Sequence, residues 1–346
     1  MRVGIVLFNL GGPDNIAGVE PFLRNLFSDP AIIRLPGFLR LPLARWIAAR
    51  RTKLAQKIYG HIGGGSPIRK ETEAQARALA ASLTETGFES EIFIAMRYSE
   101  PDSVAAARAM QAFAPDRIVL LPLYPQFSTT TTGSSFKDWD RAAATLGLTA
   151  PTSRICCYSA EAGFVAALAD HIRRTMASPK PGVAYRLLLS AHGLPKQIVA
   201  RGDPYQWQVE RTAAALVDAL GIKGRADLDY QVCYQSRVGP LKWLEPATDA
   251  EIRRAGAEGR GVVIAPIAFV SEHSETLVEL DIEYARLAEA AGVPDYRRVP
   301  TVGANAAFID GLAGLVAKAV NSGGTVNESG GRLCPARFGC CAMEMV

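Results

Sequence analysis

The sequence predicts an α/β protein built from two similar, doubly wound halves with parallel sheets, and three observations carry this prediction. Short apolar runs alternate with longer helical patterns along the whole chain. The runs are continuous rather than alternating, which is typical of parallel strands that are buried on both faces. At 346 residues, with 49% hydrophobic and 21% charged residues, the chain is long enough for two globular domains.

Six apolar runs are expected to be strands, and seven periodic segments are expected to be helices. The expected strands are residues 3–9, 91–96, 117–123, 185–191, 228–234 and 261–269. The expected helices are residues 70–86, 102–113, 161–177, 206–220, 248–256, 274–291 and 305–321.

The order of these elements suggests a domain at 1–155, a second at 156–304 and a cysteine-rich tail at 331–346. The last helix, 305–321, could pack back on the first domain. The segment between that helix and the tail, "NSGGTVNESGG", is rich in Gly, Ser and Asn and is expected to be a flexible connector.

Composition excludes several functional classes. The net charge of +4, without a Lys/Arg run, argues against nucleic acid as a partner. The opening "MRVGIVLFNLGG" has too short an apolar run for a signal peptide, and no stretch reaches the roughly 18 apolar residues of a membrane span. We therefore expect a cytoplasmic protein, in which clustered cysteines indicate a metal before a disulfide.

Polar loops follow several of the predicted strands, and in doubly wound folds ligands bind at these strand ends. The first such loop, "NLGGPD", lacks a GxGxxG helix opening, and no P-loop lysine is present, which argues against a nucleotide-dependent oxidoreductase. The others are the hydroxyl-rich "YPQFSTTTTGSS" (124–135), "SAHGLP" (190–195) and "VSEHSETLVELDIEY" (270–284).

Two of the four histidines, His192 and His273, lie in these loops. A lone histidine is more often structural, but two at corresponding strand ends favour a shared site. The helix expected after His273 places Glu275, Glu279 and Glu283 in one stripe at i, i+4 and i+8. Such a stripe is usually a solvated face. Beside a histidine it would also suit a proton relay or a cation such as Fe(II), Mn or Zn.

Six sequence blocks in this order resemble the ferrochelatases, which insert ferrous iron into protoporphyrin IX to form protohaem. The blocks are "RRTKLAQKIYGHIGGGSPI" (50–68), "MRYSEPD" (96–102), "YPQFSTTTTGSS", "LLSAHGLPKQIVARGDPY" (188–205), "YQSRVGPLKWLEPAT" (234–248) and "PIAFVSEHSETLVELDIEY" (266–284). The resemblance implies two Rossmann-like domains with a porphyrin cleft between them. Open alternatives are a chelatase for another metal or tetrapyrrole, such as coproporphyrin, and a non-enzymatic haem or metal carrier.

The resemblance also implies roles for individual residues. His192 and Glu275 would form the catalytic pair that meets the substrate Fe2+, with His273 and Glu279 beside them and Glu283 further along the polar path. The porphyrin cleft would be lined by Arg50, Arg51, Tyr59, Ser66, Tyr124 and Ser128. Weaker correspondences are Arg97, Tyr98, Trp243 and the "NLGGP" turn. Leu10 departs from the methionine of animal members.

The end of the chain, "RLCPARFGCCAMEMV", resembles the cluster-binding tail of many family members. Cys334, Cys340 and Cys341 with Cys157 would supply the four thiolates of a [2Fe–2S] cluster. Animal members take the fourth cysteine from the position of Thr129. Cys156 is the alternative to Cys157, because neighbouring strand residues face opposite sides. A Cys₄ zinc site remains open as well, whereas Cys233 is expected in the core.

One further segment, 36–51, sets Phe38, Leu39 and Trp46 among arginines. It could rest on an anionic membrane surface as a peripheral contact, or it could be a helix packed on its own domain. The oligomeric state is open, and a homodimer is one expectation.

Overall fold

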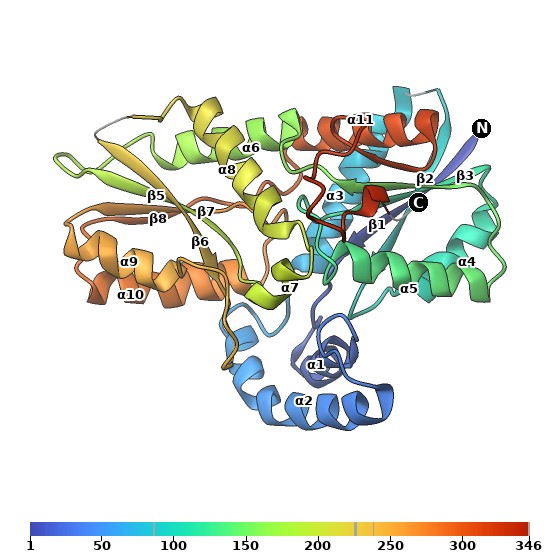
Figure 1. Cartoon of the computed structure of the whole chain (residues 1–346), viewed down its shortest axis with the longest axis horizontal. Coiled ribbons are helices and arrows are strands. Elements are labelled where there is room, and N and C mark those ends of the chain that lie inside the picture. Colours follow the sequence, from blue (N-terminus) through green and yellow to red (C-terminus); the bar gives the residue numbers. More distant parts are fainter. Residues whose placement is uncertain (86, 225–226, 238, 345–346) are drawn as a thin grey trace. The chain divides into compact units, whose positions relative to one another are not determined.

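A computed structural model describes residues 1–85, 87–224, 227–237 and 239–344 of the protein. The chain forms two compact units (Figure 1). Unit 1 comprises residues 1–157, 312–332 and 342–346, and unit 2 comprises residues 158–311 and 333–341. The tail predicted as one segment, 331–346, is thus divided between the two units.

The core of unit 1 is a parallel sheet with the strand order β2-β1-β3-β4-β9. Its strands are β1 (Arg2–Asn9), β2 (Glu89–Met96), β3 (Arg117–Pro122), β4 (Thr152–Cys157) and β9 (Thr325–Asn327). Strand β1 lies between two neighbours and under helices on both faces, which explains why its apolar run is continuous. Strand β2 lies at the edge, and its first half is partly exposed.

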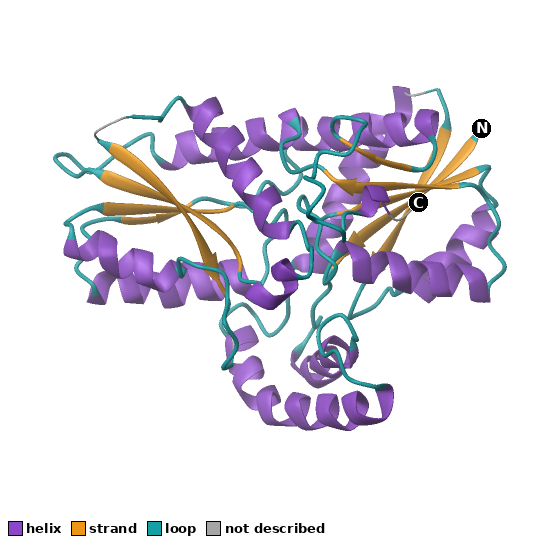
Figure 2. Ribbon diagram, viewed as in Figure 1, coloured by secondary structure: helices purple, strands orange, loops and turns teal. Residues whose placement is uncertain are grey.

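Helices enclose this sheet (Figure 2). Helices α4 and α5 cover one face, where Phe8, Met110 and Trp139 meet in the core. Helices α1 and α2 pack together around Phe22 and Tyr98. The helices of unit 1 are α1 (Val19–Ser28), α2 (Gly37–Gly60), α3 (Ile68–Ser82), α4 (Ser103–Phe113), α5 (Thr132–Thr145) and the larger part of α11 (Ala306–Ser322), with short turns η1 (Ile16–Gly18), η2 (Leu83–Glu85) and η4 (Ala342–Glu344).

Unit 2 contains a four-stranded parallel sheet with the order β6-β5-β7-β8. Helices α6 and α8 lie on one face, and α9 and α10 lie on the other (Figure 1). The elements are β5 (Tyr185–His192), β6 (Leu228–Gln235), β7 (Gly261–Pro266), β8 (Tyr296–Arg298), α6 (Ala162–Thr175), α7 (Lys196–Ala200), α8 (Tyr205–Leu220), α9 (Thr248–Ala257), the π-helix η3 (Glu275–Glu283) and α10 (Tyr284–Ala290).

The two sheets share one connectivity. In each, the first strand lies between the second and the third, so the strand order reverses beside it. Ligands of doubly wound folds bind at the carboxyl ends of the strands at this switch point. In unit 2 the switch point lies between β5 and β7, the strands that precede the loops of His192 and His273.

Several predicted elements need correction. The connector expected at 321–331 contains β9, because Val326 is buried and pairs beside β4. The single helix expected at 274–291 is the π-helix η3 followed by α10. Helices α1 and α5 and the short strands β4 and β8 were not predicted. In the described ranges, no helix combines the length and the apolar content needed to cross a bilayer.

The close approach of α9 to the end of α10 gives a test of this packing. A Cβ on Gly256 would lie 2.1 Å from the backbone oxygen of Ala291, so Gly256→Ala must move one helix. We expect it to lower the free energy of unfolding by about 1–3 kcal/mol. The control is Gly314→Ala in α11, where no atom lies within 4 Å; it should be neutral or stabilising by about 0.5–1 kcal/mol. Equal unfolding midpoints for the two variants would contradict the packing.

Candidate functional site

Three strand ends of unit 2 bring the predicted histidine and the acidic residues together. His192 is the last residue of β5 and pairs in register with Gln235, the last residue of β6. The chain beyond β7 leads through His273 into η3, which carries Glu275 and Glu279. The site therefore lies at the switch point of the sheet.

His192 and Glu275 form a hydrogen-bonded pair at the centre of this site. The Nδ1 atom of His192 lies 2.7 Å from Oε2 of Glu275. A carboxylate can only accept, so it holds the imidazole with the proton on Nδ1. Among the hydrogen bonds of the described residues, none involves Nε2, and the His192 side chain is 42% exposed. Nε2 is thus available to a substrate.

His273 lies beside this pair but is buried. Its Nδ1 is 3.0 Å from the backbone oxygen of Ser271, which also fixes the proton on Nδ1. Its Nε2 is 4.0 Å from Oε2 of Glu275, beyond hydrogen-bond length. The ring of Phe269 packs against both histidines, with its centroid 4.7 Å from that of His273 and 6.4 Å from that of His192. His273 therefore lies next to the pair without a hydrogen bond to it, and its catalytic role stays a prediction.

Glu279 belongs to a dense hydrogen-bond network that was not predicted. The backbone N–H of Ser236 donates to Oε1 of Glu279 over 2.8 Å, and the hydroxyl of Tyr284 donates to the same oxygen over 2.9 Å. The amide of Gln235 donates to Oε2 of Glu279 and to the backbone oxygen of Glu275. In the sequence, Gln235 and Ser236 follow a predicted strand and lie in the block 234–248 of the family resemblance, but neither was assigned a role.

The charges of these groups are strongly coupled. Burial opposes the charged form of His192, but the negative charge and hydrogen bond of Glu275 outweigh it and raise the pKa of His192. Burial alone would raise the pKa of Glu275, yet the charge and hydrogen bond of His192 lower it to about 2. Burial and the nearby charge of Glu275 raise the pKa of Glu279. Burial lowers the pKa of His273.

The acidic stripe is shorter than predicted. Glu275 and Glu279 point toward Ser236, whereas Glu283 is exposed. Residues 275–283 form a π-helix, in which the N–H of Tyr284 reaches the oxygen of Glu279 five residues earlier. π-Helical segments are rare in proteins, and those that occur are frequently found at functional sites.

Comparison with known proteins identifies the family. The ferrochelatase family model matches residues 2–320. The chain belongs to the ferrochelatase family. The ferrochelatase of Phenylobacterium zucineum is 53% identical over 344 residues, covering 99% of this chain and 98% of the relative. That of Caulobacter vibrioides (strain NA1000 / CB15N) is 52% identical over 343 residues, covering 98% and 97%. The predicted family and the predicted enzyme class, metal insertion into a porphyrin, are confirmed.

Solved structures support the fold. SirB from Bacillus subtilis with Fe3+ gives a TM-score of 0.55 at 14% identity, over 93% of this chain and 97% of that one. The sirohydrochlorin chelatase SirB from B. subtilis subspecies spizizenii, in complex with cobalt, gives 0.53 at 11% identity, over 93% and 97%. The predicted fold class, two α/β units of parallel strands, is confirmed.

The residues expected to line the porphyrin cleft of this ferrochelatase all belong to unit 1. The guanidinium groups of Arg50 and Arg51 on α2 lie over the rings of Trp46 and Phe27. Tyr59 and Ser128 are buried, and Ser66 and Tyr124 are half-buried. Their roles in binding porphyrin stay predictions.

Two residues of the weaker correspondences, Arg97 and Tyr98, take part in a buried hydrogen-bond cluster of unit 1. Arg97 and Tyr98 both bind the buried carboxylate of Asp29 over 2.8 Å, and Ser134 donates to the same carboxylate. Asp29 was not singled out from the sequence.

The four cysteines of the predicted cluster are divided between the two units. Cys334, Cys340 and Cys341 belong to unit 2, and Cys157 belongs to unit 1. Among the described residues, no three His, Cys, Asp or Glu side chains are gathered around a common metal position. The sulfur atoms of Cys156 and Cys157 are 3.0 Å apart at an irregularity in the pairing of β4 with β9. The expectation that these two residues face opposite sides is therefore wrong, because the pairing of β4 with β9 shifts register between Ile155 and Cys157 and the regular alternation is interrupted there.

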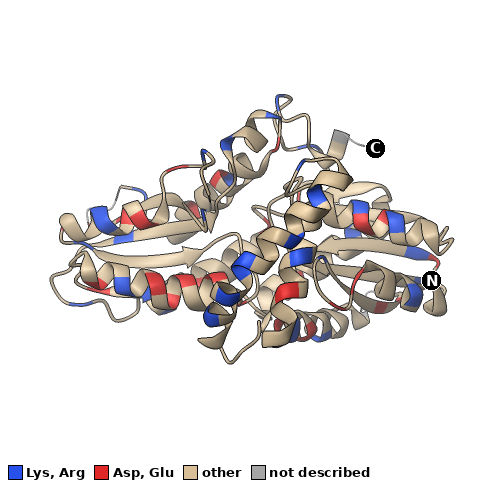
Figure 3. Cartoon of the chain, turned by 90° about the horizontal axis from the view of Figure 1, so that it is seen from below, with Lys and Arg blue, Asp and Glu red and all other residues tan. Residues whose placement is uncertain are grey.

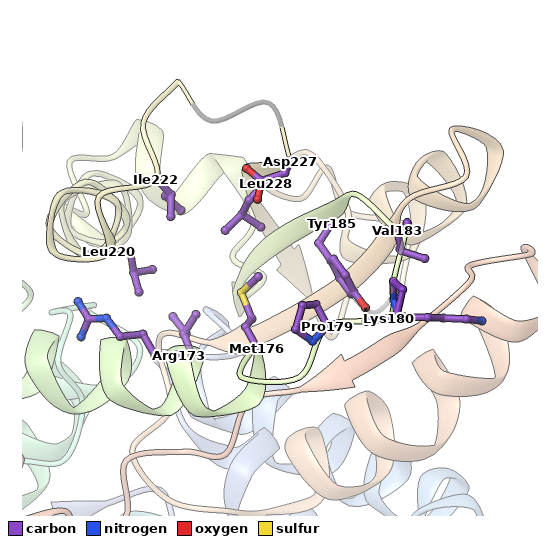
Figure 4. A pocket seen from close by; sticks show the side chains of 13 residues that line it. Arg173, Met176, Pro179, Lys180, Val183, Tyr185, Leu220, Ile222, Asp227 and Leu228 are labelled. Atoms are coloured by element: carbon purple, nitrogen blue, oxygen red, sulfur yellow. Dashed lines mark hydrogen bonds between the residues drawn. The ribbon is translucent and has the colours of Figure 1, made fainter.

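A cavity of about 390 Å³ in unit 2 lies away from this site (Figure 4). It is lined by Tyr185 and Leu228, the first residues of β5 and β6, and by Met176 and Leu220. It is therefore at the opposite end of the strands from His192, and none of the predicted site residues lines it.

The coupling of His192 to Glu275 predicts a measurable titration. A raised pKa means that His192 keeps its proton to a pH above the ordinary value of about 6.5. In Glu275→Gln the attractive charge is lost while burial remains, so the midpoint should fall. Histidine NMR titrations of the parent and Glu275→Gln would measure both. His273 should titrate below about 6.5 in each protein. An unchanged His192 midpoint in Glu275→Gln would contradict the coupling.

Proposed function

We propose that this ferrochelatase inserts Fe(II) into protoporphyrin IX at the His192–Glu275 pair of unit 2, forming protohaem and releasing two protons. The observation that supports this most is the 2.7 Å hydrogen bond between an exposed imidazole and a carboxylate at the switch point of the sheet. Protoporphyrin and Fe2+ are the substrates.

The chemistry requires a base for the two pyrrole N–H protons. His192 can accept a proton at Nε2 while Glu275 stabilises the imidazolium that forms. The same coupling raises the pKa of His192, which strengthens it as a base. A His192 side chain that is already protonated cannot accept a pyrrole proton. Activity should therefore decrease as the pH falls through the raised pKa of His192.

Glu275 also has a second task. Fe(II) arrives hydrated, and carboxylate oxygens can replace its water ligands. With its pKa near 2, Glu275 is ionised at neutral pH and can meet the cation. Glu279, whose pKa is raised, is suited to hold a proton that has left the porphyrin.

Two substitutions test the pair. His192→Ala removes the base, and we expect kcat to fall by about 10²–10⁴-fold, a typical contribution of general base catalysis. Glu275→Gln keeps the shape but removes the charge, and we expect a comparable loss. The assay is anaerobic incubation with protoporphyrin IX and Fe(II).

The control is His171→Ala, since His171 lies on α6 and bonds only weakly to the oxygen of Pro300 at 3.3 Å. Near-parent turnover by His192→Ala would rule out the proposed role of His192 as the base. If the parent binds one porphyrin and never turns over, the carrier alternative holds instead. Parallel assays with coproporphyrin and with Zn(II) or Co(II) test the other chelatase alternatives.

A second proposal concerns the cysteines: Cys157, Cys334, Cys340 and Cys341 hold a [2Fe–2S] cluster. The donor set fits by its chemistry, since four thiols suffice for such a cluster. Within unit 2, the side-chain amide of Gln208 donates to the sulfur of Cys334 over 3.2 Å, as donors do to thiolate ligands. The N–H of Cys340 binds the oxygen of Gly202, which anchors this part of the tail. A bound cluster would supply redox-active iron, which metal insertion does not require.

The purified protein should then be reddish-brown and contain two irons and two acid-labile sulfides per chain. Substituting any one of the four ligands by Ser should bleach the colour. Cys233→Ser is the matched control, because Cys233 is fully buried in the core and should leave the colour unchanged. Loss of colour in Cys156→Ser but not in Cys157→Ser would show that the fourth ligand is Cys156 and not Cys157. A colourless protein with one zinc would favour the zinc alternative.

A third proposal is peripheral membrane contact through residues 36–51. On α2, Phe38 is 77% exposed and Trp46 is 58% exposed, with Leu39 and Leu41 also exposed. The helix carries no acidic residue, and Figure 3 colours its arginines and lysines blue. Exposed apolar side chains among basic ones suit an anionic bilayer surface. A location in the cytoplasm and a homodimer likewise stay predictions.

Flotation with anionic liposomes tests the contact. The parent should float, and Phe38→Ser with Trp46→Ser should reduce binding several-fold. Tyr230→Ser, an exposed aromatic on β6, is the control and should float like the parent. No flotation of the parent above that with neutral liposomes would remove this proposal.

A further inference from the structure

We propose that the tail segment 333–341, which belongs to unit 2, positions His192. The segment holds the turn at Gly202, and this turn holds Tyr205, whose hydroxyl fixes the backbone of His192. The inference rests on the proposed function of His192, and it requires no bound cluster, because the polypeptide itself makes every contact in it. Tyr205 and the tail act through His192, so they are positioning residues.

The backbone oxygen of His192 is held by a side chain from outside the sheet. The pairing of β5 with β7 ends at Ser190 and Pro266, two residues before His192. The hydroxyl of Tyr205 donates to the oxygen of His192 over 3.1 Å and so supplies a donor where that pairing has ended. Because the imidazole is attached to this backbone, the bond to Tyr205 limits where Nε2 can lie.

Tyr205 is in turn placed by the turn that precedes it. It is the first residue of α8, and its ring is buried. Its backbone N–H donates to Oδ1 of the buried Asp203 over 3.0 Å. Asp203 follows Gly202, whose φ of +96° lies in the region that favours glycine. The direction of the phenol ring therefore depends on the position of this turn.

The tail closes over the same turn. The N–H of Cys340 donates to the backbone oxygen of Gly202 over 3.1 Å. A Cβ on Gly202 would lie 2.9 Å from the backbone nitrogen of Gly339, so the two segments are in direct backbone contact. A displacement of the tail must therefore either move the turn or break the hydrogen bond to Gly202.

Side chains anchor the tail on α8, close to Tyr205 in the chain. The rings of Phe338 and Trp207 pack with their centroids 6.2 Å apart. The guanidinium of Arg337 lies 4.7 Å from the centroid of the Phe338 ring, and that of Arg211 lies 5.5 Å from the Trp207 ring. Stacked rings and cations over their faces attract one another without a metal. These contacts can therefore hold the tail on α8 when no cluster is bound.

The sequence offers a direct probe of this link. His192–Gly193 is the only His–Gly pair of the chain. Protein labelled with ¹³C at the carbonyl of histidine and with ¹⁵N in glycine thus gives one NMR signal that joins the His192 carbonyl to the N–H of Gly193. Loss of a donor at a carbonyl shifts its ¹³C resonance upfield. Tyr205→Phe, which removes only the hydroxyl, should shift this signal upfield, and Phe338→Ala should shift it in the same direction.

Turnover should follow the signal. We expect Tyr205→Phe to lower kcat about tenfold, with KM for protoporphyrin and Fe(II) within about twofold, since the base is displaced while the substrate contacts remain. Phe338→Ala should lower kcat several-fold. The double variant should match Tyr205→Phe alone, because the tail then has no hydroxyl to act through. Parent values of kcat and of the carbonyl shift in folded Tyr205→Phe would overturn the inference, and so would independent losses that multiply in the double variant.

Phe164→Leu is the control for a general loss of stability. Phe164 is fully buried in unit 2, where it packs with Tyr158 and Phe308. The variant should have a lower melting temperature but an unchanged signal and kcat; an equal shift in it would contradict the link. Where Phe338→Ala does not fold, Phe338→Leu, which lacks the stacked ring but keeps apolar bulk, replaces it. If the carbonyl signal responds as expected but the parent does not metallate porphyrin, the link stands and the proposed function is refuted.

Discussion

The bond between His192 and Glu275 determines the properties of every group around it. It fixes the proton of the imidazole on Nδ1 and so leaves Nε2 as the nitrogen that can accept a proton. It keeps Glu275 ionised, and the retained negative charge in turn favours the protonated form of Glu279. The pKa values of two carboxylates on one short helix are thereby shifted in opposite directions, which is the arrangement that the proposed roles of meeting a cation and holding a proton would need.

The geometry of this bond is held from outside the site. Arg298 on β8 binds both oxygens of Asp281 over 2.7 Å and also binds Glu272 over 2.6 Å. It therefore ties together the loop before His273 and the π-helix after it. A bidentate guanidinium constrains direction as well as distance. This salt-bridge network fixes η3 through Asp281 and makes no contact with Glu275 or Glu279.

The sequence was informative where a pattern is long or chemically rare. Continuous apolar runs located β1, β5 and β7, and the scarcity of histidine drew attention to His192. Ser236 was missed because a serine in a polar loop looks like any other, and only its φ and its two carboxylate neighbours distinguish it. The π-helix was missed because its register depends on tertiary contacts such as those of Arg298, and helical periodicity at Glu275 and Glu279 fits either helix type.

The three-residue strand β9 has a consequence for experiments on the cysteine tail. It covers the outer edge of β4, whose backbone donors and acceptors would otherwise face water. A chain shortened before Thr325 would present that edge as a template for intermolecular pairing and would tend to aggregate. A C-terminally deleted protein would thus be insoluble even if the tail bound no metal, so its insolubility would be no evidence for a cluster. Point substitutions of the cysteines leave β9 paired with β4. They therefore distinguish the effect of losing a cluster from the effect of exposing the edge of β4.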